Sequence, residues 1–132
     1  MGKLNLAIVI PAFNEGKTIG KIVKLANKYG TTIVINDGSN DSTNQIATIS
    51  GATVVNHKFN LGYDKALLSG FNFVYKSNFD FMITIDADGQ HKPSDIENYL
   101  IELREGKDCV VGIRDKPQRI SEYLFSFYTK IF

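Results

Sequence analysis

The sequence predicts an α/β fold with a mainly parallel central sheet, and three observations indicate this class. Short segments rich in Ile, Val, Thr and Phe alternate with segments of helical periodicity. Most of the short segments are apolar on both faces, which is typical of parallel strands covered by helices on each side. The chain has 132 residues, enough for residues 1–132 to form a single domain without a disulfide or a structural metal. In such sheets ligands bind beyond the carboxyl ends of the strands, so we expect the functional residues in the loops that follow the strands.

The first half of the chain predicts three strands and two helices. In order, these are a strand at Leu4–Ile10, a helix at Thr18–Tyr29, a strand at Thr31–Asn36, a helix from Ser42 to about Ser50, and a strand at Thr53–Asn56. The strands are rich in β-branched residues, and the first ends where Pro11 breaks the apolar run. The first helix has apolar residues at i, i+3, i+4 and i+7, and Gly30 ends it. Ser42 and Gln45 have the spacing of a capping box.

The second half continues the alternation. The expected elements are a helix at Ala66–Tyr75, a strand at Phe79–Asp86, a helix that opens at Ser94 and ends at Gly106, a strand at Asp108–Gly112, and an amphipathic aromatic helix within residues 119–132. Ser94 and Glu97 form a second predicted capping box after Pro93. The last helix either packs on its own sheet, lies at a membrane interface or forms a dimer contact. The single Cys109 is flanked by valines, which favours a packed structural thiol.

Charge and composition exclude several functional classes. Lys plus Arg number 15 and Asp plus Glu 14, so the formal net charge is +1 and no basic field exists to recruit nucleic acid. The first residues carry one basic residue and a short apolar run that Pro11 breaks; this run is too short for a membrane span, and no small-residue cleavage site of a signal peptide follows it. We therefore expect a cytoplasmic protein, peripheral at the inner face of the membrane if its last helix is interfacial.

The loop after the first predicted strand, Pro11–Gly16, is neither a G-x-G-x-x-G fingerprint nor a phosphate-binding P-loop. The motifs that would indicate a dinucleotide-dependent dehydrogenase or a P-loop NTPase are therefore missing from this loop. The loop after the second strand runs from Asn36 to Thr43, and turn chemistry explains most of its residues. Asp37 stands where that strand ends, and its carboxylate could accept hydrogen bonds from a ribose hydroxyl or a base N–H.

The segment Asp86–His91 carries two carboxylates with one residue between them. In an extended chain Asp86 and Asp88 point to the same face, and two carboxylates that lie close together repel unless a cation lies between them. Oxygen ligands of this kind favour Mg²⁺ or Mn²⁺ and leave coordination positions for substrate phosphates. Gln90 or His91 could add a ligand. The alternative interpretation is a solvated acidic turn before the helix that opens at Ser94.

Four segments together resemble the family 2 GT-A glycosyltransferases. They are Val9–Glu15, Val34–Thr43, Asn60–Ala66 and Asp86–His91. The pattern is most similar to that of the dolichyl- and polyprenyl-phosphate sugar transferases, which includes D-A-D-x-Q-H-x-P. The resemblance implies a GT-A, Rossmann-like three-layer sandwich that binds nucleotide sugars over residues 1–132. It also implies that the family's catalytic domain continues well past the segment that matches here.

The resemblance implies a role for each matching residue. Nucleotide-binding residues are Pro11, Ala12, Asn14, Glu15, Asp37 and Asp86. The metal ligands for Mg²⁺ or Mn²⁺ on the donor diphosphate are Asp86, Asp88 and Gln90, and the catalytic residues are Asp88 and Arg114. Lys116 and Arg119 could assist Arg114, while Gly62 and Ala66 pack below the donor.

The implied reaction transfers a sugar from a GDP- or UDP-sugar to an acceptor such as a polyprenyl phosphate, with inversion at the anomeric carbon. An anionic lipid phosphate needs little help from a base, whereas a sugar hydroxyl requires a carboxylate base. The matching segments cover the donor-nucleotide half of the family's catalytic domain and lack much of its acceptor half, so a nucleotide-sugar binding module without turnover is the alternative. A nucleotidyltransferase is disfavoured because Pro11–Gly16 has no Arg and only one Gly.

Overall fold

The computed structural model describes residues 5–107 and 110. The chain divides into two compact units, Met1–Glu97 and Asn98–Phe132. The elements are β1 (Leu6–Ala12), α1 (Ile19–Ala26), β2 (Thr31–Asn36), α2 (Thr43–Ile49), β3 (Thr53–Asn56), α3 (Tyr63–Tyr75), β4 (Phe81–Thr84), a 3-10 turn (Pro93–Asp95) and α4 (Ile96–Arg104). The prediction of one domain over residues 1–132 stays a prediction. The predicted strand at Asp108–Gly112, with Cys109, and the helix within residues 119–132 fall outside the described residues, Val110 apart.

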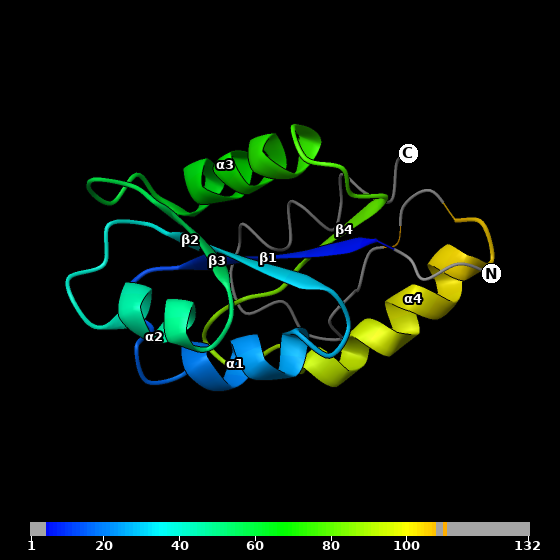
Figure 1. Cartoon of the computed structure of the whole chain (residues 1–132), viewed down its shortest axis with the longest axis horizontal. Helices are drawn as coiled ribbons and strands as arrows, with labels where there is room; N and C mark the ends of the chain where they lie inside the picture. The colour runs from blue at the N-terminus through cyan, green and yellow to red at the C-terminus, as the bar shows by residue number, and fades with distance from the viewer. Residues whose placement is uncertain (1–4, 108–109, 111–132) are drawn as a thin grey trace, which may run out of the picture. The chain divides into compact units, whose positions relative to one another are not determined.

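The four described strands form one parallel sheet in the order β3-β2-β1-β4 (Figure 1). The prediction of a parallel sheet is confirmed. From β1 the chain adds β2 and β3 on one side and then crosses over to place β4 on the other side of β1. The order therefore reverses between β1 and β4, and the carboxyl ends of these two strands border the crevice where ligands bind in open α/β sheets.

Helices cover both faces of the sheet, which gives the first unit the three layers that were predicted. Figure 1 shows α3 on one side and α1 and α2 on the other. All seven residues of β1 are buried, as expected for the central strand of such a sandwich. On the α3 side Ala7, Val9, Ile33 and Ile35 pack with Ala66. Helix α3 approaches closely at Gly70, where an added Cβ would lie 2.4 Å from Val9 Cγ1.

The predicted strands Thr31–Asn36 and Thr53–Asn56 are confirmed to the residue as β2 and β3. Strand β1 was expected to end before Pro11 but continues to Ala12, with Pro11 opposite Ile35. Proline is tolerated there because β4 ends at Thr84, opposite Val9, so the missing N–H of Pro11 removes no hydrogen bond to β4. Strand β4 is also shorter than its predicted span, because the chain turns after Ile85 donates to the Val9 carbonyl.

Both predicted capping boxes are wrong. Ser42 occupies the N-cap position of α2 but its side chain makes no capping bond; Asp41 Oδ1 accepts the Thr43 N–H instead, at 2.9 Å. Ser94 lies inside the 3-10 turn, whose N-cap position is Lys92. The predicted end at Gly106 is supported by its positive φ of 90°. Among the residues described, no helix has the length and hydropathy to span a membrane.

Candidate functional site

The loops after β1 and β2 are joined by four hydrogen bonds, three of which come from the consecutive backbone N–H groups of residues 14–16. Asn14 N–H donates to Ser39 Oγ at 3.0 Å, and Asn14 Oδ1 in turn accepts the Asn40 N–H at 2.9 Å. The next two N–H groups also donate across the loops, from Glu15 to Thr43 Oγ1 at 2.9 Å and from Gly16 to Asp41 Oδ2 at 3.0 Å. Asn14 has φ of 54°, in the left-handed region that asparagine tolerates better than most residues. The side chains of both loops are thus held in one fixed arrangement.

The predicted residues of the first loop differ in exposure. Pro11 and Ala12 are buried at the end of β1, where the Ala12 carbonyl accepts the Asp37 N–H at 2.8 Å. Asn14 is exposed and Glu15 is half-buried. Their roles in nucleotide binding stay predictions.

Thr18 connects this loop to the loop that follows β4. Its hydroxyl lies 2.7 Å from the Ala87 carbonyl oxygen and 3.2 Å from Glu15 Oε2. The start of α1 is therefore bonded to the residue that separates Asp86 from Asp88. Nothing in the sequence singles out Thr18, because the contact joins residues that are 69 positions apart.

Asp37 lies at the centre of a hydrogen-bond network at the end of β2 (3% exposed). Its Oδ1 lies 2.7 Å from His57 Nδ1 and accepts the Leu61 N–H at 2.9 Å, while Oδ2 accepts the Gly62 N–H at 2.9 Å. Burial alone would raise the pKa of Asp37, but the hydrogen bonds from His57, Leu61 and Gly62 outweigh it and hold the pKa below its ordinary value of 3.8. The ionised carboxylate therefore anchors the segment between β3 and α3.

His57 is a residue of the site that the sequence analysis missed. An ionised Asp37 only accepts, so His57 Nδ1 carries a proton and donates to it. The other nitrogen, Nε2, lies 2.8 Å from Ser69 Oγ of α3, which donates to it when the ring is neutral. The signal was available in the register: Asn36 pairs with Asn56 in the parallel β2–β3 ladder, so the residues after them, Asp37 and His57, lie level.

The lowered pKa of Asp37 predicts a pH dependence of stability. Because the folded pKa lies below the unfolded value, ionised Asp37 stabilises the fold above about pH 4, and this contribution is lost as the pH falls through the folded pKa. We expect the urea midpoint of the chain to drop between about pH 5 and pH 3, and to drop less in Asp37→Asn, whose side chain does not titrate. An equal fall of the urea midpoint with pH in the unaltered chain and in Asp37→Asn would contradict the prediction. Hydrogen bonds from Thr43 also lower the pKa of Asp41. Asp41 is present in both chains, so it does not account for a difference between them.

Two of the three predicted metal ligands, Asp86 and Asp88, follow β4 with the alternation that was expected. Ile85 and Ala87 are buried at 4% exposure each, whereas the Asp86 side chain is 27% exposed and Asp88 is exposed. Asp86 Oδ1 accepts the Tyr63 hydroxyl at 3.0 Å, and Asp88 Oδ1 accepts the Gln90 N–H at 2.9 Å. Both carboxylates are therefore oriented by other groups and reach the solvent beside the reversal point of the sheet.

His91 Nδ1 accepts the Asp86 N–H at 3.0 Å and lies 3.4 Å from Asp86 Oδ2. A nitrogen that accepts carries no proton, so the ring is neutral in this arrangement and its contact with the carboxylate is not an ion pair. No group of three or more His, Cys, Asp or Glu side chains arranged to hold a metal occurs within the described part of the chain. Two exposed carboxylates fit a hard divalent cation that takes its remaining oxygens from substrate and water.

The segment that leads into α3 joins the two halves of the site. Asp37 holds the Gly62 N–H, and the next residue, Tyr63, reaches Asp86. The ends of β2 and β4, which flank β1 on opposite sides, are thus linked through the start of α3. Arg114 lies outside the described residues.

The parallel sheet with helices on both faces has the Rossmann-like arrangement of the GT-A fold, and comparison with known proteins assigns the family. The chain belongs to glycosyl transferase family 2, whose family description matches residues 7–123. It is 32% identical over 129 residues to the UDP-N-acetylglucosamine–dolichyl-phosphate N-acetylglucosaminyltransferase of Methanococcus voltae, covering 83% of this chain and 51% of that protein. It is 29% identical over 126 residues to the undecaprenyl-phosphate 4-deoxy-4-formamido-L-arabinose transferase of Yersinia pestis, covering 86% of this chain and 38% of that protein.

A solved structure supports the same assignment. Glucosyl-3-phosphoglycerate synthase from Mycobacterium tuberculosis, in complex with Mn²⁺, UDP-glucose and phosphoglyceric acid, superposes with a TM-score of 0.64 and 26% identity. The match covers 79% of this chain and 40% of that chain. The predicted GT-A, Rossmann-like fold is confirmed. The chain spans about half or less of the length of the relatives described here.

Proposed function

We propose that this chain binds a nucleoside-diphosphate sugar and a divalent cation at the carboxyl ends of β1 and β4, and transfers the sugar to a phosphate-bearing acceptor. The observation that carries the proposal is the pair of oriented, solvent-accessible carboxylates of Asp86 and Asp88 beside the reversal point of the sheet. Relatives that act on dolichyl or undecaprenyl phosphate support a polyprenyl phosphate as acceptor. The cation is Mg²⁺ or Mn²⁺, since its ligands are oxygens.

In this proposal Asp86 and Asp88 hold the cation, with the Gln90 amide oxygen as a further ligand. When bound, the cation neutralises charge that develops on the nucleoside diphosphate as it leaves. Asn14, Glu15 and Asp37 border the position of the nucleoside, with Pro11 and Ala12 as the wall beneath it. Asp88 and Arg114 are the catalytic residues in this proposal. The acceptor oxygen attacks from the opposite side of the anomeric carbon and inverts its configuration.

Calorimetric titration with UDP- and GDP-sugars in the presence of Mn²⁺ tests donor binding. We expect one of these donors to bind, and we expect Asp86→Asn combined with Asp88→Asn to weaken binding at least about tenfold, a loss typical of altered metal-site residues. The matched control is Asp64→Asn combined with Asp95→Asn, which removes the same charge at exposed positions of α3 and the 3-10 turn. Absence of binding to every donor, or equal binding by the two double variants, would reject the proposal.

Transfer is measured separately, by following a labelled sugar from the bound donor to polyprenyl phosphate. A lipid-linked product supports the transferase. Donor binding without a product supports the second candidate function, a nucleotide-sugar binding module without turnover. That candidate is favoured by one observation, that the chain spans only 38% to 51% of the two polyprenyl-phosphate transferases that it matches.

A further inference from the structure

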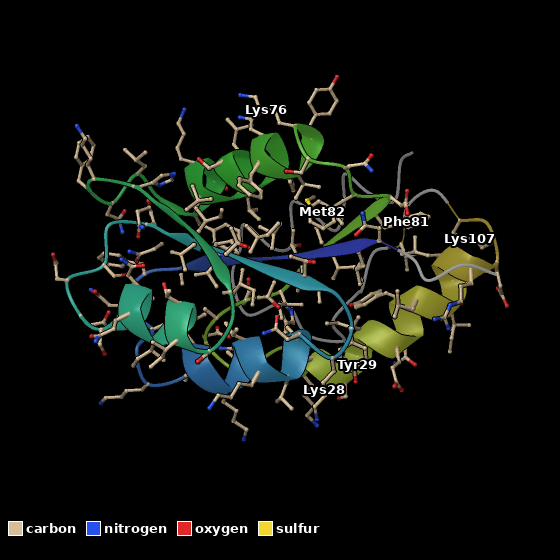
Figure 2. The ribbon with its side chains drawn as sticks, viewed as in Figure 1. Lys28, Tyr29, Lys76, Phe81, Met82 and Lys107 are labelled. Atoms are coloured by element: carbon tan, nitrogen blue, oxygen red, sulfur yellow. The ribbon has the colours of Figure 1, made fainter. Side chains whose placement is uncertain are left out.

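Four exposed lysines, here called the lysine stripe, follow one another along α1 and the turns that flank it. Lys21 and Lys24 lie within α1, Lys17 precedes the helix and Lys28 follows it, at intervals of four, three and four residues. All four are exposed, whereas Ile19, Ile22, Val23 and Ala26 are buried on the opposite side. Figure 2 shows Lys28 projecting away from the sheet at the end of α1. The stripe is therefore a solvent-facing surface that follows α1 and its two flanking turns.

Lysines outnumber acids along the stripe, and the nearest acids lie at one end of it: Glu15 precedes Lys17, and Asp41 Oδ2 accepts the Gly16 N–H at 3.0 Å. Residues 16–36 contain four lysines and no Asp or Glu, and residues 42–57 of the neighbouring α2–β3 region contain no charged residue apart from His57 if it is protonated. Within the described ranges the close contacts between basic side chains and carboxylates are those of His57 and His91, and none involves a lysine. A chain with a net charge of +1 thus concentrates four positive charges on one surface.

An apolar groove lies beside the stripe, between α1 and α2. The helices meet closely at Gly20, where an added Cβ would lie 2.8 Å from Ile46 Cγ2. The groove has a volume of about 540 Å³, and its lining includes Lys21, Lys24, Leu25, Ile46 and Ile49. Ile49 is 77% exposed, although it is a large aliphatic residue. Positive charge and exposed apolar surface are therefore combined on this α1–α2 surface.

We propose that the α1–α2 surface, formed by the four lysines and Ile49, docks on the surface of an anionic phospholipid bilayer. Lysine ammonium groups lie at the level of the lipid phosphates while their methylene stems cover apolar surface. Ile49 and the groove then contact the boundary between the headgroups and the acyl chains, as interfacial helices do. A nucleic acid would match the charge but would leave Ile49 without an apolar partner. The inference does not rest on the proposed function, because docking requires no donor nucleotide.

Sedimentation with lipid vesicles tests the docking surface. The intact chain should bind vesicles of equal parts phosphatidylcholine and phosphatidylglycerol, should bind phosphatidylcholine alone far more weakly, and should be released by high salt. Replacing all four lysines of the stripe by glutamine should lower the partition coefficient by more than about a hundredfold, at roughly fivefold per lysine. Ile49→Ser should also weaken binding, with the charge unchanged.

The matched control replaces four other exposed lysines by glutamine: Lys58, Lys65, Lys76 and Lys107. Lys76 follows α3, on the other side of the sheet from α1 (Figure 2). This variant has the same net charge as the stripe variant and should keep most of the vesicle binding. Failure of the unaltered chain to bind anionic vesicles would overturn the proposal. So would equal losses in the two lysine variants, or full binding by the stripe variant, because either result places the contact elsewhere. Circular dichroism checks that each variant is folded.

Discussion

Replacing Asp37 with alanine is expected to lower the free energy of unfolding by about 3 kcal/mol, because the change leaves buried hydrogen-bond donors without their acceptor. The carboxylate is 3% exposed and receives hydrogen bonds from His57, Leu61 and Gly62. Leu61 is itself exposed, so water can replace part of its bond, which is why the expected loss is not larger. Urea denaturation followed by circular dichroism measures the effect.

The control for this prediction is Asp64→Ala, which removes an exposed carboxylate from the first turn of α3. Its loss should amount to a few tenths of a kcal/mol, from the interaction with the helix dipole. His57→Gln should fall between the two variants, since it retains the Leu61 and Gly62 bonds to Asp37. A loss below about 1 kcal/mol for Asp37→Ala would show that the network contributes little to stability.

The sequence predicted the centre of the sheet because β1 and β2 are buried by helices on both faces. An apolar run marks β2 and two β-branched valines mark β3, and polar residues end both strands, so local composition was sufficient. The start of α3 was placed three residues too late, at Ala66 instead of Tyr63. It begins after Gly62, which has φ of 95° and whose N–H is held by Asp37 from another part of the chain. A tertiary hydrogen bond therefore decides a boundary that propensity alone does not show.

The candidate site was predicted to the level of its carboxylates but not of their partners. Asp37, Asp86 and Asp88 follow strands, and their positions in a parallel sheet required only the strand assignments. Thr18, His57, Tyr63 and Ser69 were missed. Their contacts join residues between 12 and 69 positions apart, and only the strand register and the orientation of α3 bring these side chains together. The capping box at Ser42 failed because Asp41 bonds both Thr43 and Gly16 and replaces the Ser42 side chain as the cap of α2.

Gly38→Ala is expected to destabilise the chain by about 3 kcal/mol, through a backbone clash added to conformational strain. Gly38 has φ of +70°, and a Cβ built on it would lie 2.4 Å from the Phe59 carbonyl carbon and 2.6 Å from Asn60 N. These are backbone atoms, so no change of rotamer relieves the contact and one of the two loops must move. The moving segment includes Leu61, so the Asp37 network is expected to weaken as well.

Gly89→Ala separates the two contributions because Gly89 shares the unfavourable conformation without the contact. Its φ is +81°, but an added Cβ would meet nothing within 4 Å. Strain alone should therefore cost about 1 kcal/mol at Gly89, and the difference between the two variants, about 2 kcal/mol, measures the clash at Gly38. If the two variants are equally stable, the loops after β2 and β3 move apart with no loss in the free energy of unfolding. In that case the close approach at Gly38 would not be what holds Asp37 and the start of α3 together, and the hydrogen bonds to the carboxylate would carry that role alone.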